Sequence, residues 1–215
     1  MILLSQRQAE ELLTYGEGLL VTAVTSAPLP RPPKLALLDE EYGVFATLRR
    51  GEELRGCIGS FWGSGTVRSV LPRVIREAAL LDPRFPPVTQ QELAGTTLSV
   101  SLLSRSTPVS SHERIELGRH GIILTVGRRR AIFLPEVALE QSWDLPTTLE
   151  MLTRKAGAPP GSWRGPDARF SVFETVKIGR HPDSHCPGVL VEPSAGRIAG
   201  CRDVEVEMEA DDERQ

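Results

Sequence analysis

A cysteine set between two glycines and close to an arginine is the most unusual feature of this sequence. Residues 54–59 read Leu-Arg-Gly-Cys-Ile-Gly, which places Cys57 two positions after Arg55. Glycine permits backbone conformations that other residues avoid and lets another group approach closely, so this segment suits an accessible thiol. A neighbouring cation lowers the pKa of a thiol and favours the nucleophilic thiolate. Cys57 is therefore a candidate catalytic nucleophile, with buried packing and metal binding as the alternatives.

A thiol nucleophile also needs a base, and His120 is the candidate in this sequence. It precedes Gly121 at the start of an apolar run, and its position is 63 residues after Cys57. Only the fold could bring the two side chains together, because a cysteine–histidine pair has no distinctive spacing outside known motifs. The alternative is a histidine that simply bonds a backbone carbonyl.

Two carboxylates and a guanidinium group occur within eight residues of each other. Glu77, Asp82 and Arg84 could orient a polar ligand or shift the pKa of a nearby acid or thiol. The structural alternative is that Asp82 and Arg84 tie the end of a helix to a hairpin. Gln141 and Trp143 could line a cleft, whereas the alternative for the tryptophan is to anchor the following helix.

Five segments around these residues resemble, in order and spacing, the AMMECR domain family over about residues 5–178. They are residues 54–59 (LRGCIG), 82–87 (DPRFPP), 120–121 (HG), 134–137 (LPEV) and 140–143 (EQSW). The resemblance implies a compact α+β protein with a site near Cys57, without assigning the thiol a role. In prokaryotes the family often accompanies a Memo-like protein and a radical-SAM protein, an association named AmmeMemoRadiSam. The resemblance therefore implies these partners and the modification of a substrate that it does not identify.

A hairpin is needed to position the cysteine. Residues 42–49 and 54–60 read as its two strands, joined by a Gly-Glu-Glu turn. Alternation along the second strand places Arg55 and Cys57 on one face, unless glycine introduces a bulge.

Helical spacing of apolar residues predicts three long helices, over residues 5–25, about 69–81 and 144–156. The second must end at Asp82, because the proline that follows disfavours helical geometry at the preceding residue. This helix therefore delivers Glu77, Asp82 and Arg84 to one end. Thr89 and Glu92 then fit a capping box that begins a short helix.

Alternation and β-branched residues predict further strands over residues 96–103, 122–126, 131–134 and 170–178. Strands and helices do not alternate along the chain, and no Rossmann or P-loop glycine pattern occurs. These observations favour an α+β fold with an antiparallel or mixed sheet and about three long helices. The fold would form one domain or two close subdomains.

Charge and cysteine usage limit the class of protein. The chain carries 25 basic and 28 acidic residues, and seven of the acidic residues lie within residues 203–215. The remainder is only mildly basic and lacks an aromatic RNA-binding signature, so nucleic acid is not the favoured partner, although the arginines at 128–130 could contact phosphate. Three cysteines suit a reducing compartment, and no apolar run is long enough to cross a membrane. We expect a cytoplasmic protein without a membrane partner.

The family resemblance ends near residue 179, so we expect a domain over residues 1–179 and an extension with an acidic, flexible tail over 180–215. Four potential zinc ligands in the extension are His181, His185, Cys186 and Cys201. Their spacing is irregular for a zinc site, and we expect neither a metal nor a cofactor.

The favoured function is an AMMECR-type protein that acts with its two partners through a cleft around Cys57. The alternative is a non-catalytic module that binds RNA, a peptide or a protein.

Overall fold

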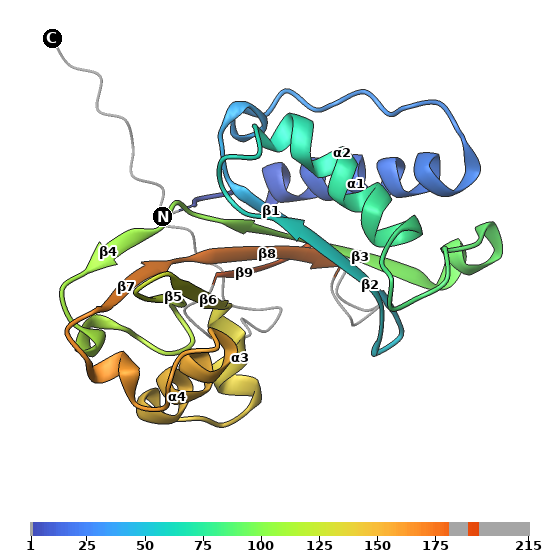
Figure 1. Ribbon diagram of the computed structural model, residues 1–215. Helices are drawn as coiled ribbons and strands as arrows, with labels where there is room; N and C mark the ends of the chain where they lie inside the picture. The colour runs from blue at the N-terminus through green and yellow to red at the C-terminus, as the bar shows by residue number, and fades with distance from the viewer. Residues whose placement is uncertain (1, 181–188, 194–215) are drawn as a thin grey trace, which may run out of the picture.

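The structure, a computed structural model, describes residues 2–180 and 189–193, which form two lobes (Figure 1). The larger lobe contains α1 (Gln6–Thr25), β1 (Gly43–Arg50), β2 (Glu53–Ser60), α2 (Val67–Leu80), β3 (Thr96–Leu103), β8 (Thr175–Arg180) and β9 (Val189–Pro193). The smaller lobe contains β4 (Thr107–Val109), β5 (Gly121–Val126), β6 (Arg129–Phe133), α3 (Pro135–Glu140), α4 (Leu145–Lys155) and β7 (Ala168–Phe173). Short 3-10 helices are η1 (Ala36–Asp39), η2 (Gln90–Gly95), η3 (His112–Arg114) and η4 (Ser162–Arg164).

Each lobe is organised around its own antiparallel sheet. The larger lobe has five strands in the order β2-β1-β3-β8-β9, and the smaller lobe has four in the order β4-β7-β5-β6. The three long helices are α1, α2 and α4, with 20, 14 and 11 residues. The expected α+β fold is therefore confirmed.

The helices α1 and α2 cover one face of the five-stranded sheet (Figure 1). Ser5 and Gln8 form a complete capping box at the start of α1. The helix α2 begins at Val67, two residues earlier than the sequence suggested, so Pro72 lies inside the helix, beyond its first turn. It ends at Leu80, just before the Asp-Pro pair. In the part of the chain described, no helix is long and apolar enough to span a membrane.

The smaller lobe is inserted between two neighbouring strands of the larger sheet. The chain leaves β3 for the smaller lobe and returns through β7 to β8, which pairs with β3. At the crossing, Ser104 N–H donates to the Glu174 carbonyl at 2.9 Å, and Glu174 N–H donates to Ser104 Oγ at 3.0 Å. The prediction of one strand over residues 170–178 is therefore wrong, because the chain changes sheets at Glu174.

The two lobes have separate apolar cores that are linked by a third cluster. Leu103, Ile123 and Phe173 form the buried centre of this link. Further side chains packed against it come from both lobes, namely Phe45, Phe61, Trp62, Ile132 and Leu134. The link holds the smaller lobe beside the uncovered face of the larger sheet.

The larger sheet continues past the domain boundary expected from the sequence. Residue 179 lies within β8, and β9 pairs with β8 along residues 176–180. Val191 of β9 packs against the core of the larger lobe. At least this part of residues 180–215 belongs to the sheet, whereas the four potential zinc ligands lie outside the described residues.

Candidate functional site

Cys57 lies on β2, which is an edge strand of the larger sheet. In the pairing of β1 with β2, Leu48 lies opposite Gly56, and the next residue, Arg49, lies opposite Leu54. Arg55 is therefore the extra residue of a β-bulge. A methyl group at Gly56 would lie 2.2 Å from the carbonyl oxygen of a residue in α2. The glycine therefore allows close packing of the strand on the helix.

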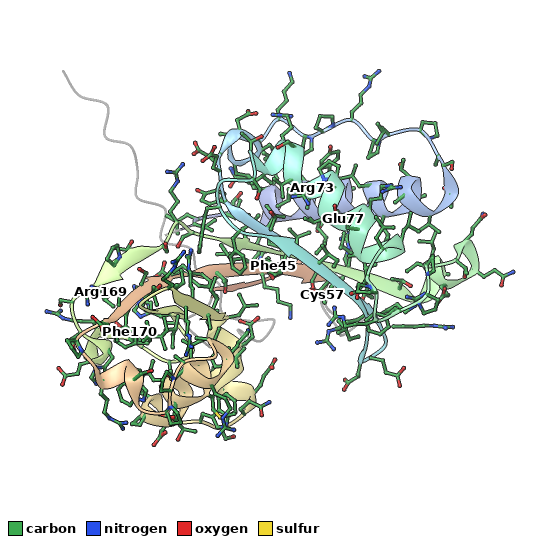
Figure 2. The ribbon with its side chains drawn as sticks, viewed as in Figure 1. Phe45, Cys57, Arg73, Glu77, Arg169 and Phe170 are labelled. Carbon is green, nitrogen blue, oxygen red and sulfur yellow. The ribbon has the colours of Figure 1, made fainter. Side chains whose placement is uncertain are left out.

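The Cys57 side chain is on the sheet face opposite α1 and α2. Cys57 pairs with Thr47 of β1, and its Sγ lies 3.3 Å from Thr47 Oγ1, at hydrogen-bond distance. Ser99 of β3 continues the same row, while Phe45 and Ser101 occupy the next row. We call these five residues the Cys57 face. Figure 2 shows Phe45 and Cys57 on the side of the sheet turned toward the smaller lobe.

Asp82 and Arg84 bind the free backbone edge of β2 at Cys57. Cys57 N–H donates to Asp82 Oδ2 at 2.8 Å, and Arg84 Nη2 donates to the Cys57 carbonyl at 3.0 Å. Arg84 Nη2 also pairs with Asp82 Oδ2 at 2.7 Å, and Asp82 is buried. The pKa of the Asp82 carboxyl is held well below its usual range, mainly by the Arg84 guanidinium. Hydrogen bonds from the backbone N–H groups of Cys57 and Arg84 lower this pKa further. This arrangement corresponds to the structural alternative for the pair, a tie between helix end and hairpin.

Arg55 is held by Glu92, which the sequence identified only as a capping residue. Arg55 Nε donates to Glu92 Oε1 at 3.0 Å, and its Nη2 bonds to Glu92 Oε2 and to the Pro87 carbonyl. The expected capping box between Thr89 and Glu92 is present. Arg55 and then Thr89 lower the pKa of Glu92 to about 2. Arg55 Nη1 is buried without a partner among the described residues, which costs free energy unless water reaches it.

The remaining residues suggested by the sequence do not join this cluster. His120 lies in the smaller lobe, where its Nδ1 accepts a hydrogen bond from Glu116 N–H at 3.0 Å. Glu77 pairs with Arg73 on α2 at 3.1 Å, on the helix layer of the larger lobe (Figure 2). Among the described residues, no contact connects His120 or Glu77 to Cys57. Glu77 does lie in the last turn of α2, at the expected helix end, but its carboxylate pairs with Arg73 instead of joining Asp82 and Arg84.

Gln141 and Trp143 also lie in the smaller lobe. Gln141 is the exposed C-cap of α3. Trp143 is half-buried, and its ring lies 6.1 Å from that of Phe133 in β6. Trp143 therefore anchors the chain between α3 and α4, as in the structural alternative for this residue.

A pocket of about 450 Å³ opens between the lobes, beside the Cys57 face. We call it the inter-lobe pocket. It is lined by Phe61, Trp62, Arg130, Ala131, Ile132 and Lys155. The Phe45 ring of the Cys57 face meets the Phe61 ring edge-on at 5.3 Å. Lys155 Nζ donates to the Ile132 carbonyl at 2.9 Å. Sequence reasoning missed this pocket, although the adjacent aromatic residues 61 and 62 in a Gly/Ser-rich segment were an available signal.

The AMMECR1 family profile matches residues 18–178, a range that includes both the Cys57 face and the inter-lobe pocket. The chain belongs to the AMMECR1 family. An archaeal protein from Methanopyrus kandleri is 38% identical over 151 residues, which cover 66% of this chain and 73% of the relative. A protein from Pyrobaculum arsenaticum is 30% identical over 213 residues, 94% of each chain. The crystal structure of an uncharacterized protein from Pyrococcus horikoshii is similar with a TM-score of 0.73 and 27% identity, over 88% of this chain and 98% of that chain.

Similarity to AMMECR1 relatives extends beyond the expected boundary. Residues 1–179 make up 83% of the 215-residue chain. The Pyrobaculum and Pyrococcus matches cover 94% and 88% of it, so both must include part of residues 180–215. This agrees with the pairing of β9 in the sheet.

The described part of the site in this AMMECR1 family member offers several groups that suit binding. It combines a half-buried thiol, short polar side chains, aromatic surface and two cations from the smaller lobe. Within residues 2–180 and 189–193, no group of three histidine, cysteine or carboxylate side chains is placed to hold a metal ion.

Proposed function

We propose that this AMMECR1 family member is a non-catalytic component that binds a protein partner between its lobes and works with Memo-like and radical-SAM proteins. The observation that supports this most is the environment of Cys57, whose backbone is bound by Asp82 and Arg84. Its thiol meets the Thr47 hydroxyl, and no base among the described residues contacts it to take its proton. Modification of the substrate is then the task of the partners.

The surface fits an extended polypeptide segment. The Cys57 face carries mainly short side chains, so another chain can approach the sheet closely, with Phe61 and Trp62 as apolar area beside it. Arg130 and Lys155 add positive charge, and no carboxylate of residues 2–180 and 189–193 lines the inter-lobe pocket. We therefore expect the bound segment to combine acidic and apolar side chains.

Titration calorimetry tests this proposal. It measures binding of the purified chain to the Memo-like and radical-SAM proteins of the same genome. We expect at least one of them to bind. Arg130→Glu and Lys155→Glu should each weaken binding about tenfold or more, because each reverses a charge at the pocket. Arg154→Glu is the matched control, since Arg154 is exposed on the same helix as Lys155 but does not line the pocket.

A Cys57→Ser variant separates binding from thiol chemistry. Serine has nearly the size of cysteine, so partner binding should change less than about twofold, and partner-dependent modification should continue. Loss of modification with intact binding would instead favour a nucleophilic Cys57. Absence of binding to both proteins, or equal effects of Arg130→Glu and Arg154→Glu, would contradict the proposed surface.

A further inference from the structure

A second pocket lies in the smaller lobe and is separate from the site around Cys57. It has a volume of about 650 Å³ and forms where η3, η4 and the start of β7 meet. Arg169 and Phe170 line it, and Figure 2 shows both at the opposite side of the view from Cys57. We call it the Trp163 pocket, after the tryptophan in its wall.

The wall of the Trp163 pocket is aromatic and firmly held. Trp163 and Phe170 are buried in the core of the smaller lobe. The His112 ring meets Trp163 edge-on at 5.0 Å and lies 6.0 Å from Phe170. Trp163 Nε1 donates to Glu150 Oε2 at 3.0 Å, which fixes the orientation of the indole. These contacts within the lobe hold the rings in defined orientations, which favours a preorganised wall.

Two arginines give the pocket a positive charge that none of the described lining side chains neutralises. The Arg164 guanidinium stacks over the Trp163 ring, 3.9 Å from its centroid. Arg169 Nη1 donates to the backbone carbonyls of residues 166 and 168. In the described part of the chain neither arginine has a carboxylate partner, in contrast to the arginines at 55, 84, 119 and 180.

Hydroxyl groups complete the set of hydrogen-bond donors at this pocket. Ser110 and Ser111 line it beside His112. Ser111 Oγ accepts a hydrogen bond from Glu113 N–H, which leaves its hydroxyl hydrogen free to donate. Guanidinium and hydroxyl donors around an uncompensated positive charge match the several acceptor oxygens of a phosphate group.

We propose that the Trp163 pocket binds a mononucleotide. The phosphate would lie near Arg164 and Arg169, and the base against the half-buried His112 ring, which Trp163 and Phe170 support from within the core. The pocket volume falls within the range of about 300–1,000 Å³ that is typical of small-molecule sites. A free nucleotide and the 5′ end of an RNA offer the same chemistry. This site is independent of the proposed partner surface between the lobes.

Titration calorimetry of the full chain with AMP, adenosine and inorganic phosphate tests the site. AMP should bind one to one and at least about tenfold more tightly than either fragment, because only AMP engages both the wall and the arginines. Arg164→Gln and Arg169→Gln should each weaken AMP binding about tenfold or more. Arg154→Gln removes a similar charge from an exposed position of the smaller lobe that lines neither pocket, and it should have no effect.

A 5′-phosphorylated RNA trinucleotide distinguishes the two sources of ligand. If the RNA binds more tightly than AMP, and Arg164→Gln weakens both to the same extent, the site is assigned to an RNA end. If AMP binds more tightly than the RNA, the site is assigned to a free nucleotide. Melting curves of the variants verify that they remain folded. The proposal is overturned if AMP and the RNA both fail to bind, or if both arginine variants bind like the unchanged protein.

Discussion

The glycines of the LRGCIG segment are in close contact with neighbours on opposite faces of β2. A methyl group at Gly56 would lie 2.2 Å from the Ala78 carbonyl oxygen of α2. A methyl group at Gly59 would lie 2.1 Å from the ring of Phe45, its cross-strand partner. These glycines therefore permit tight packing around Cys57, in addition to any freedom that they give the backbone.

We expect Gly56→Ala to destabilise the protein by about 2–4 kcal/mol, because β2 must move away from the backbone of α2. Gly95→Ala is the control, since the nearest atom to its added methyl group is 3.9 Å away. That change should alter stability by less than about 0.5 kcal/mol. Urea unfolding measures both values, and equal midpoints would show that β2 is not held firmly against the helix.

At the scale of elements, the segment after α2 substitutes for a missing neighbour of β2. An exposed sheet edge invites pairing with other chains, and proteins commonly cover or block such edges. Asp82 accepts from the Cys57 N–H and Arg84 donates to the Cys57 carbonyl, so both backbone groups are satisfied. Arg55 and Glu92 attach η2 to the same strand. The edge of β2 at the cysteine is consequently closed to strand addition.

We expect Asp82→Asn to lower stability at pH 7 by about 2 kcal/mol, because hydrogen bonds to a buried charged group are weakened. Since folding lowers the pKa of Asp82, its contribution is present above the unfolded value of 3.8 and is lost as the pH falls through the folded value. The unchanged protein should therefore lose stability more steeply below about pH 4 than the variant does. Thermal melting from pH 7 to pH 2.5 measures this difference, and parallel curves would argue against the role of Asp82.

At the scale of the whole molecule, the smaller lobe is an insertion that depends on the larger sheet for its position. Its two connections leave β3 and enter β8, which are hydrogen-bonded neighbours. Arg119 of the smaller lobe pairs with Glu174 at the crossing, 2.9 Å apart. The inter-lobe pocket therefore depends on packing at the link between the two cores.

Truncation of the chain tests where the larger lobe ends. Removal of residues 181–215 deletes β9 and exposes the edge of β8, so we expect a loss of about 2 kcal/mol, or roughly 4–8 °C in melting temperature. Removal of residues 194–215 keeps β9 and should change the melting temperature by less than about 2 °C. Equal melting temperatures for the two truncated chains would show that β9 contributes little to stability.

Local sequence was sufficient for the features that depend on neighbouring residues. The capping box at Thr89, the hairpin that carries Cys57 and the end of α2 before Asp82 all follow from contacts within a few positions. The same motifs identified the family, whose profile matches most of the chain. The fold class follows because the order of helices and strands excludes a doubly wound sheet.

Long-range pairing decided the rest. Alternation with a period of two continues through Glu174, so the sequence cannot show that the chain changes sheets there. Arg55 meets Glu92 across 37 positions, and the same folding leaves His120 in the other lobe from Cys57. These long-range contacts depend on which strands become neighbours and on a single-residue bulge in β2. Strand order and the bulge are properties of the packed sheet rather than of any local segment.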